Sequence, residues 1–227
     1  MIKKSLEYVC AGNNGRSPLA ETIAKNYINL KYSKLANIIE ISSSGTLVDA
    51  EFNFGNAKFL IARGYSNTPQ LYSRDEIDII ENEILINDNP LEKYQKNGVF
   101  RNLVNSLAER TLTYFQTEEK RFRDKFLNSL SLKYESHPKQ IEVDSDISLF
   151  LPVDAKNYRH IKNIYIQAKP TISSRIEILS DYAKTEPIPT PIGSPYEEEW
   201  IETFKIVKKA AENSIDRFIE EYIKNAN

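Results

Sequence analysis

Short apolar runs alternate with helical patterns in the first part of the chain. The run Leu6 to Cys10 contains Tyr and Val and is broken at once by AGNNG, which predicts a buried strand running into a tight loop. Ser17 and Pro18 suit the cap and first turn of a helix, and apolar residues then recur at four-residue steps to about Asn29. Strand, loop and helix therefore follow one another without a break.

The same alternation continues along the chain and defines the predicted fold class. Further strands are predicted over Ile38–Ser43, Ile147–Leu151 and Arg175–Leu179. Further helices are predicted over Asn56–Arg63, ended by Gly64, and over Asn157–Gln167. This order of elements is typical of an α/β protein, so we expect a doubly wound, four-stranded parallel sheet with helices on both faces.

The carboxyl-terminal helix has the clearest start signal. Ser194-Pro195-Tyr196-Glu197 places Ser at the cap, Pro at the first helical position and Glu at the third, which is a capping box. Apolar residues follow at three- and four-residue steps, namely Trp200, Phe204, Val207, Ala211, Ile215, Phe218 and Tyr222. We expect an amphipathic helix that runs to about Ile223 and closes over the sheet.

Residues from about Asp75 to Val143 interrupt the alternation. Apolar residues with helical spacing lie within this segment, namely Phe100, Leu103, Val104, Leu107, Phe115, Phe122, Phe126 and Leu130. We expect a helical insertion, residues 75–143, within a single domain that covers residues 1–227. Two interpretations of it remain open: a helical hairpin that enlarges the fold, or a lid or recruiting element for a protein partner.

Composition excludes several classes of function. The chain has 30 Lys and Arg against 32 Asp and Glu, and it has no basic cluster, so nucleic acid is not an expected partner. No apolar run is long enough to span a membrane or to form a signal peptide, so we expect a cytoplasmic protein with no membrane contact. His137 and His160 have no metal-ligand spacing, and we expect neither a metal nor a cofactor.

The segment CAGNNGRS has the pattern of an anion-binding loop. Cys10 stands at a strand end, Arg16 and Ser17 open a helix, and the loop between them is Ala11, Gly12, Asn13, Asn14 and Gly15. Backbone N–H groups in such a loop can turn inward, and the helix N-terminus adds positive potential. The Arg16 guanidinium can hold two oxygens of a phosphate or sulfate.

Cys10 is the only cysteine, so it acts as a lone thiol if it acts at all. An isolated Cys at a strand end is usually a small buried hydrophobic residue. At the base of an anion-binding loop, however, donors and positive potential favour the thiolate, which is the form that attacks phosphorus. The complete pattern of strand, loop and Arg-Ser-Pro favours an oxyanion site.

The segment VCAGNNGRSPLAE resembles the signature of the low-molecular-weight protein tyrosine phosphatases, V-C-x-G-N-x-C-R-S-P-x-A-E. The resemblance extends to SSSGT at 42–46, Gly64-Tyr65 and Ser73-Arg74, LSDYA at 179–183, IPTPIG at 188–193 and the last helix. It covers roughly residues 1–74 and 146–227. It implies that Cys10 is the nucleophile, Arg16 the phosphate clamp, Asn13 an organiser of the loop, and Ser17 a donor to the thiolate.

The chain departs from the family pattern at two positions. Gly15 replaces the second Cys of the loop, so an oxidised Cys10 has no resolving thiol in the chain. Thr190 stands where the family has the Asp that protonates the leaving oxygen, and a threonine hydroxyl has no useful acidity near neutral pH. Asp181 and Glu186 are near Thr190 in sequence, but a solvated role is expected for both.

These features predict a phosphomonoesterase that forms a phosphocysteine at Cys10 and turns over slowly for want of an acid. Its expected substrates are phosphorylated proteins or small aryl phosphates. The alternative is a weakly active or inactive pseudophosphatase that binds a phosphorylated ligand. Arsenate reduction shares the fold, but the thioredoxin-linked enzymes need further cysteines, so it would require an external thiol here.

Overall fold

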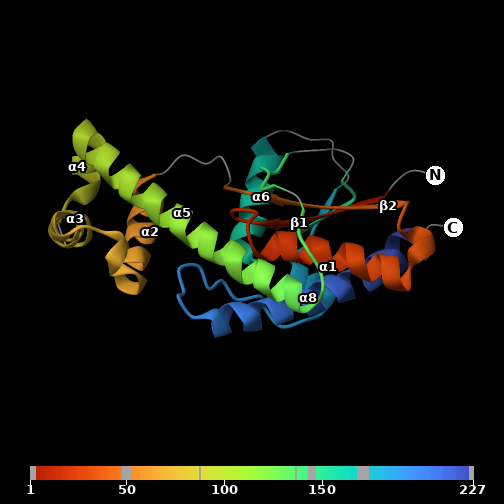
Figure 1. Ribbon diagram of the computed structural model, residues 1–227. Helices are drawn as coiled ribbons and strands as arrows, with labels where there is room; N and C mark the ends of the chain where they lie inside the picture. The colour runs from red at the N-terminus through yellow and green to blue at the C-terminus, as the bar shows by residue number, and fades with distance from the viewer. Residues whose placement is uncertain are drawn as a thin grey trace. The chain divides into compact units, whose positions relative to one another are not determined.

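The structure is a computed structural model that describes residues 4–47, 53–86, 88–135, 137–142, 147–167 and 174–224. The chain forms two compact units (Figure 1). Unit 1 comprises Met1–Asp49, Lys120–Thr190 and Glu198–Asn227, and unit 2 comprises Ala50–Glu119 and Pro191–Glu197. That the whole chain behaves as one domain stays a prediction, and the expected end of the insertion, Val143, lies outside the described residues.

Unit 1 contains the predicted four-stranded parallel sheet. Its strands are β1 (Lys4–Cys10), β2 (Ile39–Gly45), β3 (Leu149–Pro152) and β4 (Arg175–Ile176), in the order β2-β1-β3-β4. All three pairings are parallel, and Cys10 lies opposite Gly45 at the end of the β1–β2 ladder. The expected fold class is confirmed, and β1, which carries the cysteine, is one of the two inner strands.

Helices cover both faces of this sheet (Figure 1). On one face lie α1 (Arg16–Lys31), α8 (Glu197–Ile219) and the last turns of α5 (Gly98–Ser129), and on the other lies α6 (Ala155–Gln167). The arrangement follows from the alternation of side chains along β1, because Leu6, Tyr8 and Cys10 enter the core with α1 and α8. Val9 instead packs with α6. Shorter elements of unit 1 are η1 (Ser33–Leu35), α7 (Leu179–Ala183) and η4 (Glu220–Lys224).

The last turns of α5 belong to the core of unit 1, although they come from the segment predicted as an insertion. Phe122 stacks on Trp200 with ring centroids 6.1 Å apart, and Phe126 packs against Phe204 at 5.8 Å. Both partners are on α8. Aromatic pairs in this range contribute beyond their area of burial, so this part of the insertion is an integral part of the sheet-bearing unit.

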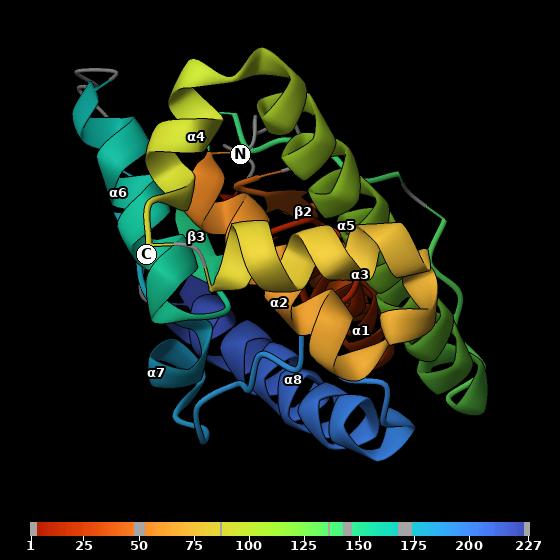
Figure 2. The same ribbon diagram turned by 90° about the vertical axis from the view of Figure 1, so that its left-hand side faces the viewer.

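The regular elements in the described part of unit 2 are all helical (Figure 2). Its elements are α2 (Phe54–Asn67), η2 (Pro69–Leu71), α3 (Arg74–Ile79), η3 (Ile80–Leu85), α4 (Pro90–Lys96) and the first turns of α5. They enclose a second apolar core that includes Ile61, Ile80, Ile84 and Val104. Ser73, one of the residues that carry the family resemblance, caps α3 in a complete capping box with Glu76.

Four predictions about element boundaries were wrong. The N-cap of α1 is Gly15 and not Ser17. Gly64 does not end α2, which continues to Asn67; Gly64 is required because a side chain there would overlap Tyr72 and Thr111. The predicted strand over Arg175–Leu179 is paired only at its first two residues, and Leu179 begins α7. The helix expected from the capping box begins at Glu197, and Ser194 Oγ accepts a hydrogen bond from the N–H of Tyr196.

None of the helices in the described part of the chain is long and apolar enough to cross a bilayer.

Candidate functional site

The predicted loop joins the end of β1 to the start of α1. β1 ends at Cys10 and α1 begins at Arg16. Two of the first carbonyls are held by residues that follow β2: Thr46 N–H donates to the Cys10 oxygen and Leu47 N–H to the Ala11 oxygen, each at 2.9 Å. The end of β2 therefore ties the first part of the loop to the sheet.

The hydrogen bonds to Thr46 and Leu47 turn the Cys10 and Ala11 carbonyls out of the loop, and this fixes the direction of the N–H groups that follow them. In a trans peptide the C=O and the following N–H point to opposite sides, and the described chain has no cis peptide bond. The Gly12 oxygen is also held, by Asn14 Nδ2 at 2.9 Å. Among the described residues, none of the N–H groups of residues 11–15 donates to a backbone carbonyl. This arrangement leaves donors for an anion inside the loop.

Asn13 organises the loop through three hydrogen bonds. Its backbone adopts the left-handed conformation, with φ of 51°. Its Nδ2 donates to Ser17 Oγ and Ser43 Oγ, each at 3.0 Å, and its Oδ1 accepts from the N–H of Lys139 at 3.0 Å. The side chain is fully buried, so these contacts fix the loop to α1, β2 and residue 139.

The thiol lies against the start of α1. Ser17 Oγ is 3.0 Å from Cys10 Sγ and 3.2 Å from the Ser44 oxygen, and the cysteine is 2 % exposed. A hydroxyl at this distance donates to a thiolate and stabilises its charge. Two residues earlier in β1, burial raises the pKa of Tyr8 above its ordinary value, and the neutral phenol bonds to Ser214 Oγ at 2.7 Å.

Arg16 is buried, with 2 % of its surface exposed. Its Nη1 donates to Asp154 Oδ2 at 3.1 Å and to Thr190 Oγ1 at 2.9 Å, and it lies 3.4 Å from the Pro189 oxygen. Its Nε is buried and has no hydrogen-bond partner among the described residues. A buried guanidinium nitrogen without an acceptor is costly, which indicates that a ligand oxygen completes it.

Asp154 is a residue of this site that the sequence interpretation missed. It lies two residues after the end of β3, the neighbour of β1, and its Oδ1 accepts from both the N–H and Nδ2 of Asn157 at 2.8 Å. Its Oδ2 is thereby aimed at Arg16. An Asp at the carboxyl end of a strand and directly before a helix is a signal that could have revealed it.

The predicted site residues are brought together, including the distant Thr190. Thr190 Oγ1 is 3.5 Å from Asp154 Oδ2, so hydroxyl, carboxylate and guanidinium form one cluster. Asp181 and Glu186 are both exposed. In the described part of the chain, no group of His, Cys, Asp and Glu side chains is arranged to hold a metal ion.

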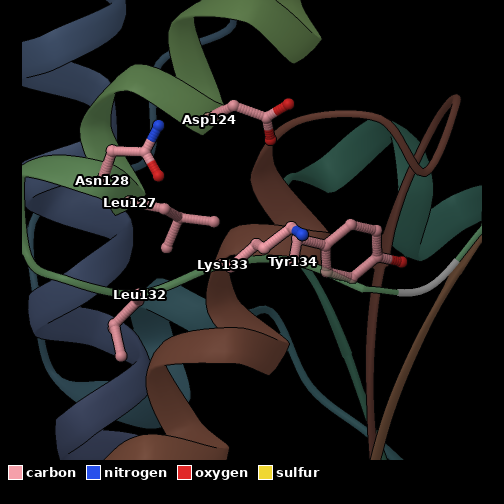
Figure 3. Close-up of a pocket in the computed structure, with 6 residues that line it drawn as sticks. All are labelled: Asp124, Leu127, Asn128, Leu132, Lys133 and Tyr134. Atoms are coloured by element: carbon pink, nitrogen blue, oxygen red, sulfur yellow. The ribbon is translucent and has the colours of Figure 1, made fainter.

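A cavity of about 150 Å³ lies beside the end of α5 (Figure 3). It is lined by Asp124, Leu127, Asn128, Leu132, Lys133 and Tyr134. None of these is a residue of the loop, so the cavity is not the site of the predicted chemistry.

Solved structures share this architecture. SP-PTP, a low-molecular-weight protein tyrosine phosphatase from Streptococcus pyogenes, is 16 % identical, with 98 % of each chain covered and a TM-score of 0.52. The chain has the low-molecular-weight phosphatase fold. The YwlE arginine phosphatase from Geobacillus stearothermophilus is 13 % identical, covering 99 % of this chain and 98 % of its own, with a TM-score of 0.55.

A protein tyrosine phosphatase from Entamoeba histolytica, solved with Hepes in its active site, is 19 % identical over 96 % of this chain and 98 % of its own, with a TM-score of 0.53. No protein-family model matches the chain, and no curated protein matches it. The expected resemblance to the low-molecular-weight phosphatases is thus confirmed at the level of the fold.

Proposed function

We propose that this protein is a phosphomonoesterase of the tyrosine phosphatase type, with Cys10 as nucleophile and Arg16 as phosphate clamp. The observation that carries the proposal is the buried Arg16 Nε, which lacks an acceptor beside a loop whose carbonyls are turned outward. A phosphate oxygen supplies that acceptor, and other phosphate oxygens accept from the N–H groups of Ala11 to Gly15.

In the reaction, the Cys10 thiolate attacks phosphorus, the S–P bond forms and the bond from phosphorus to the leaving oxygen breaks. Ser17 stabilises the thiolate through its hydroxyl at 3.0 Å. Water then attacks the phosphocysteine, which releases inorganic phosphate and regenerates the thiolate. The N–H groups of the loop and Arg16 stabilise the charge on the transferred phosphoryl group in both steps.

The site lacks a group that protonates the leaving oxygen efficiently. Thr190 has a hydroxyl where the family signature has a carboxylic acid, and both oxygens of Asp154 already accept hydrogen bonds from Arg16, Asn157 and Thr190. The leaving oxygen therefore departs as an anion and takes its proton from water. General acid catalysis typically contributes 10²–10⁴-fold, so turnover is slow for basic leaving groups.

Thr190 also supports a second candidate, a pseudophosphatase that binds a phosphorylated ligand without useful turnover. Its hydroxyl donates to Asp154 and accepts from Arg16. In this role Thr190 positions the Arg16 guanidinium and does not supply a proton. In both cases the ligand is a phosphorylated protein or a small aryl phosphate. Recruitment of a protein partner through residues 75–143 is part of the same proposal.

An aryl phosphate assay with and without vanadate tests the proposal. We expect vanadate-sensitive turnover that disappears in Cys10→Ser while phosphate binding is retained, because the thiolate has no substitute in the loop. Arg16→Ala should lose both binding and turnover. Binding without turnover in the wild type would favour the pseudophosphatase, and residual activity in Cys10→Ser equal to that of the wild type would contradict a phosphocysteine mechanism.

A further inference from the structure

We propose that Arg123, on the last turns of α5, is a positioning residue that orients the Asn14–Gly15 peptide of the anion-binding loop. The inference rests on the proposed function, because it concerns the oxyanion that the loop would bind. Arg123 lies in the segment 75–143, which the resemblance to the phosphatase family leaves unexplained.

Arg123 is held rigidly against the loop. Its side chain is 3 % exposed, and its Nη1 donates to the carbonyl oxygen of Asn14 at 2.5 Å. Its Nε and Nη2 donate to Asp124 Oδ1 at 2.9 and 2.6 Å, and its guanidinium lies 4.6 Å from the centre of the Tyr134 ring. Asp124 and Tyr134 both line the cavity shown in Figure 3. A planar donor fixed on three sides can orient the carbonyl that it binds.

The orientation of the Asn14 carbonyl determines the direction of the next N–H. The two groups lie on opposite sides of a trans peptide, so a carbonyl directed at Arg123 turns the Gly15 N–H away from Arg123 and toward the loop interior. A flipped peptide would present a carbonyl oxygen to the anion instead. A flip of the Asn14–Gly15 peptide would thus replace an attractive contact between the Gly15 N–H and the anion with a repulsive contact between the Asn14 carbonyl oxygen and the anion.

This peptide needs an external restraint because of Gly15. Glycine has few steric limits on its backbone, and Gly15 at the start of α1 has φ of −119°, ψ of −81° and no side-chain cap. The carbonyls of Cys10 and Ala11 are held by backbone N–H groups that follow β2. The Asn14 carbonyl is held by a side chain from α5. Where the family signature has a second Cys, this chain combines a flexible Gly15 with the Arg123 contact.

The effect of Arg123 is chiefly geometric. Asp124 accepts two hydrogen bonds from the guanidinium, so its charge offsets much of the positive potential that Arg123 would add at the loop. We therefore expect the loss of Arg123 to weaken oxyanion binding through one N–H group. The neighbouring N–H groups should be unaffected.

Selective labelling of glycine with ¹⁵N tests this in the full chain, which has seven glycines. Inorganic phosphate is titrated into the wild type, Arg123→Met and the control Lys120→Met, an exposed residue on the same helix. In the wild type and in Lys120→Met, the Gly12 and Gly15 amide resonances should both shift. In Arg123→Met only Gly12 should shift, and the phosphate dissociation constant should rise roughly tenfold. Arg123→Lys should recover part of the Gly15 shift.

The outcomes separate this inference from the proposed function. If neither amide responds to phosphate in the wild type, the oxyanion site itself is wrong. If Gly12 and Gly15 respond equally in the wild type and in Arg123→Met, the site stands and the role of Arg123 is overturned. If Arg123→Met does not fold, Arg123→Gln carries the same prediction, because its shorter side chain does not reach the Asn14 carbonyl in the same geometry.

Discussion

Thr190 Oγ1 lies 2.9 Å from Nη1 of Arg16, so the two side chains to which we assign the acid position and the phosphate clamp are in contact. The same guanidinium nitrogen also binds Asp154. Under the proposed function, position 190 is the place of the acid, and its side chain is a hydroxyl. The proposed reaction has two requirements at residue 190: its side chain must lie near Arg16, and that side chain must be acidic. Thr190 meets the first requirement and not the second.

Restoring the acid should accelerate turnover. In Thr190→Asp a carboxylic acid replaces the hydroxyl, and we expect turnover of phenyl phosphate or phosphotyrosine to rise by one or more orders of magnitude, up to roughly 10²–10⁴-fold. Nitrophenyl phosphate should gain less, because nitrophenolate leaves readily without a proton. Steady-state kinetics with both substrates measure this, and Thr190→Asn controls for the change in shape. An equal gain in Thr190→Asn would show that acidity is not the limiting property.

Removing Asp154 should destabilise the protein and increase the stabilisation that phosphate gives. Arg16 is 2 % exposed, so Asp154→Ala leaves a buried guanidinium without its ion-pair partner, and we expect a loss of about 3 kcal/mol. A bound anion then supplies the missing negative charge. Phosphate should therefore raise the melting temperature more in Asp154→Ala than in the wild type, as measured by calorimetry. A smaller increase in the variant would mean that Asp154 is needed to hold Arg16 in its binding orientation.

Two glycines of α2 should respond in opposite directions. In Gly64→Ala the new methyl group would overlap Tyr72 and Thr111, whose hydroxyls lie 2.6 Å apart, so we expect a loss of roughly 1–3 kcal/mol in unfolding free energy. At Gly55 a methyl group would meet only Asn53 Oδ1 at 3.4 Å. Gly55→Ala should thus stabilise the helix by up to about 1 kcal/mol. Urea unfolding measures both, and a neutral Gly64→Ala would contradict the packing around α2.

The stability of unit 1 should depend on pH through Asp216. Partial burial would raise the pKa of Asp216, but hydrogen bonds from Lys31, Tyr32 and Tyr27 outweigh it and lower that pKa below its ordinary value. A carboxyl group whose pKa is lowered on folding contributes stability above its unfolded pKa of about 3.9 and loses it as pH falls through the folded value.

Asp216→Asn should therefore lower the melting temperature at neutral pH and have less effect near the folded pKa. Thermal melts at several pH values, with Glu40→Gln as an exposed control, measure this difference. A pH-independent effect of Asp216→Asn would show that its hydrogen bonds act through geometry and not through charge.

Much of the fold could be predicted because its signals are local. The apolar run ending at Cys10, the Gly- and Asn-containing loop and the helix opened by Arg16 gave the correct order and nearly the correct bounds. Local signals did not place Thr190 at the site. Only the family resemblance did. The contact of Thr190 with Arg16 spans 174 positions and has no local signal.

The errors arose where tertiary contacts override local preference. Gly64 has the character of a helix end, but the close packing of Tyr72 and Thr111 against α2 requires a glycine inside the helix. The position of Asp154 between a strand and a helix is a local signal, but its contact with Arg16 depends on β3 lying beside β1, which sequence periodicity does not reveal. The contact of Arg123 with the loop has no local signal, because it depends on where α5 ends in space.

The position of β1 between β2 and β3 also affects how the protein emerges from the ribosome. Val9 pairs with Pro152, and Asp154 lies two residues later, so the partner of Arg16 is synthesised roughly 140 residues after the loop itself. At translation rates of about 5–20 residues per second, the nascent chain carries an incomplete sheet for roughly 7–30 s. During that interval the segments of its core that are already synthesised are β2, α1 and the end of α5. We therefore expect the thiol to be more accessible to oxidants and foreign thiols during synthesis than after the native fold buries it.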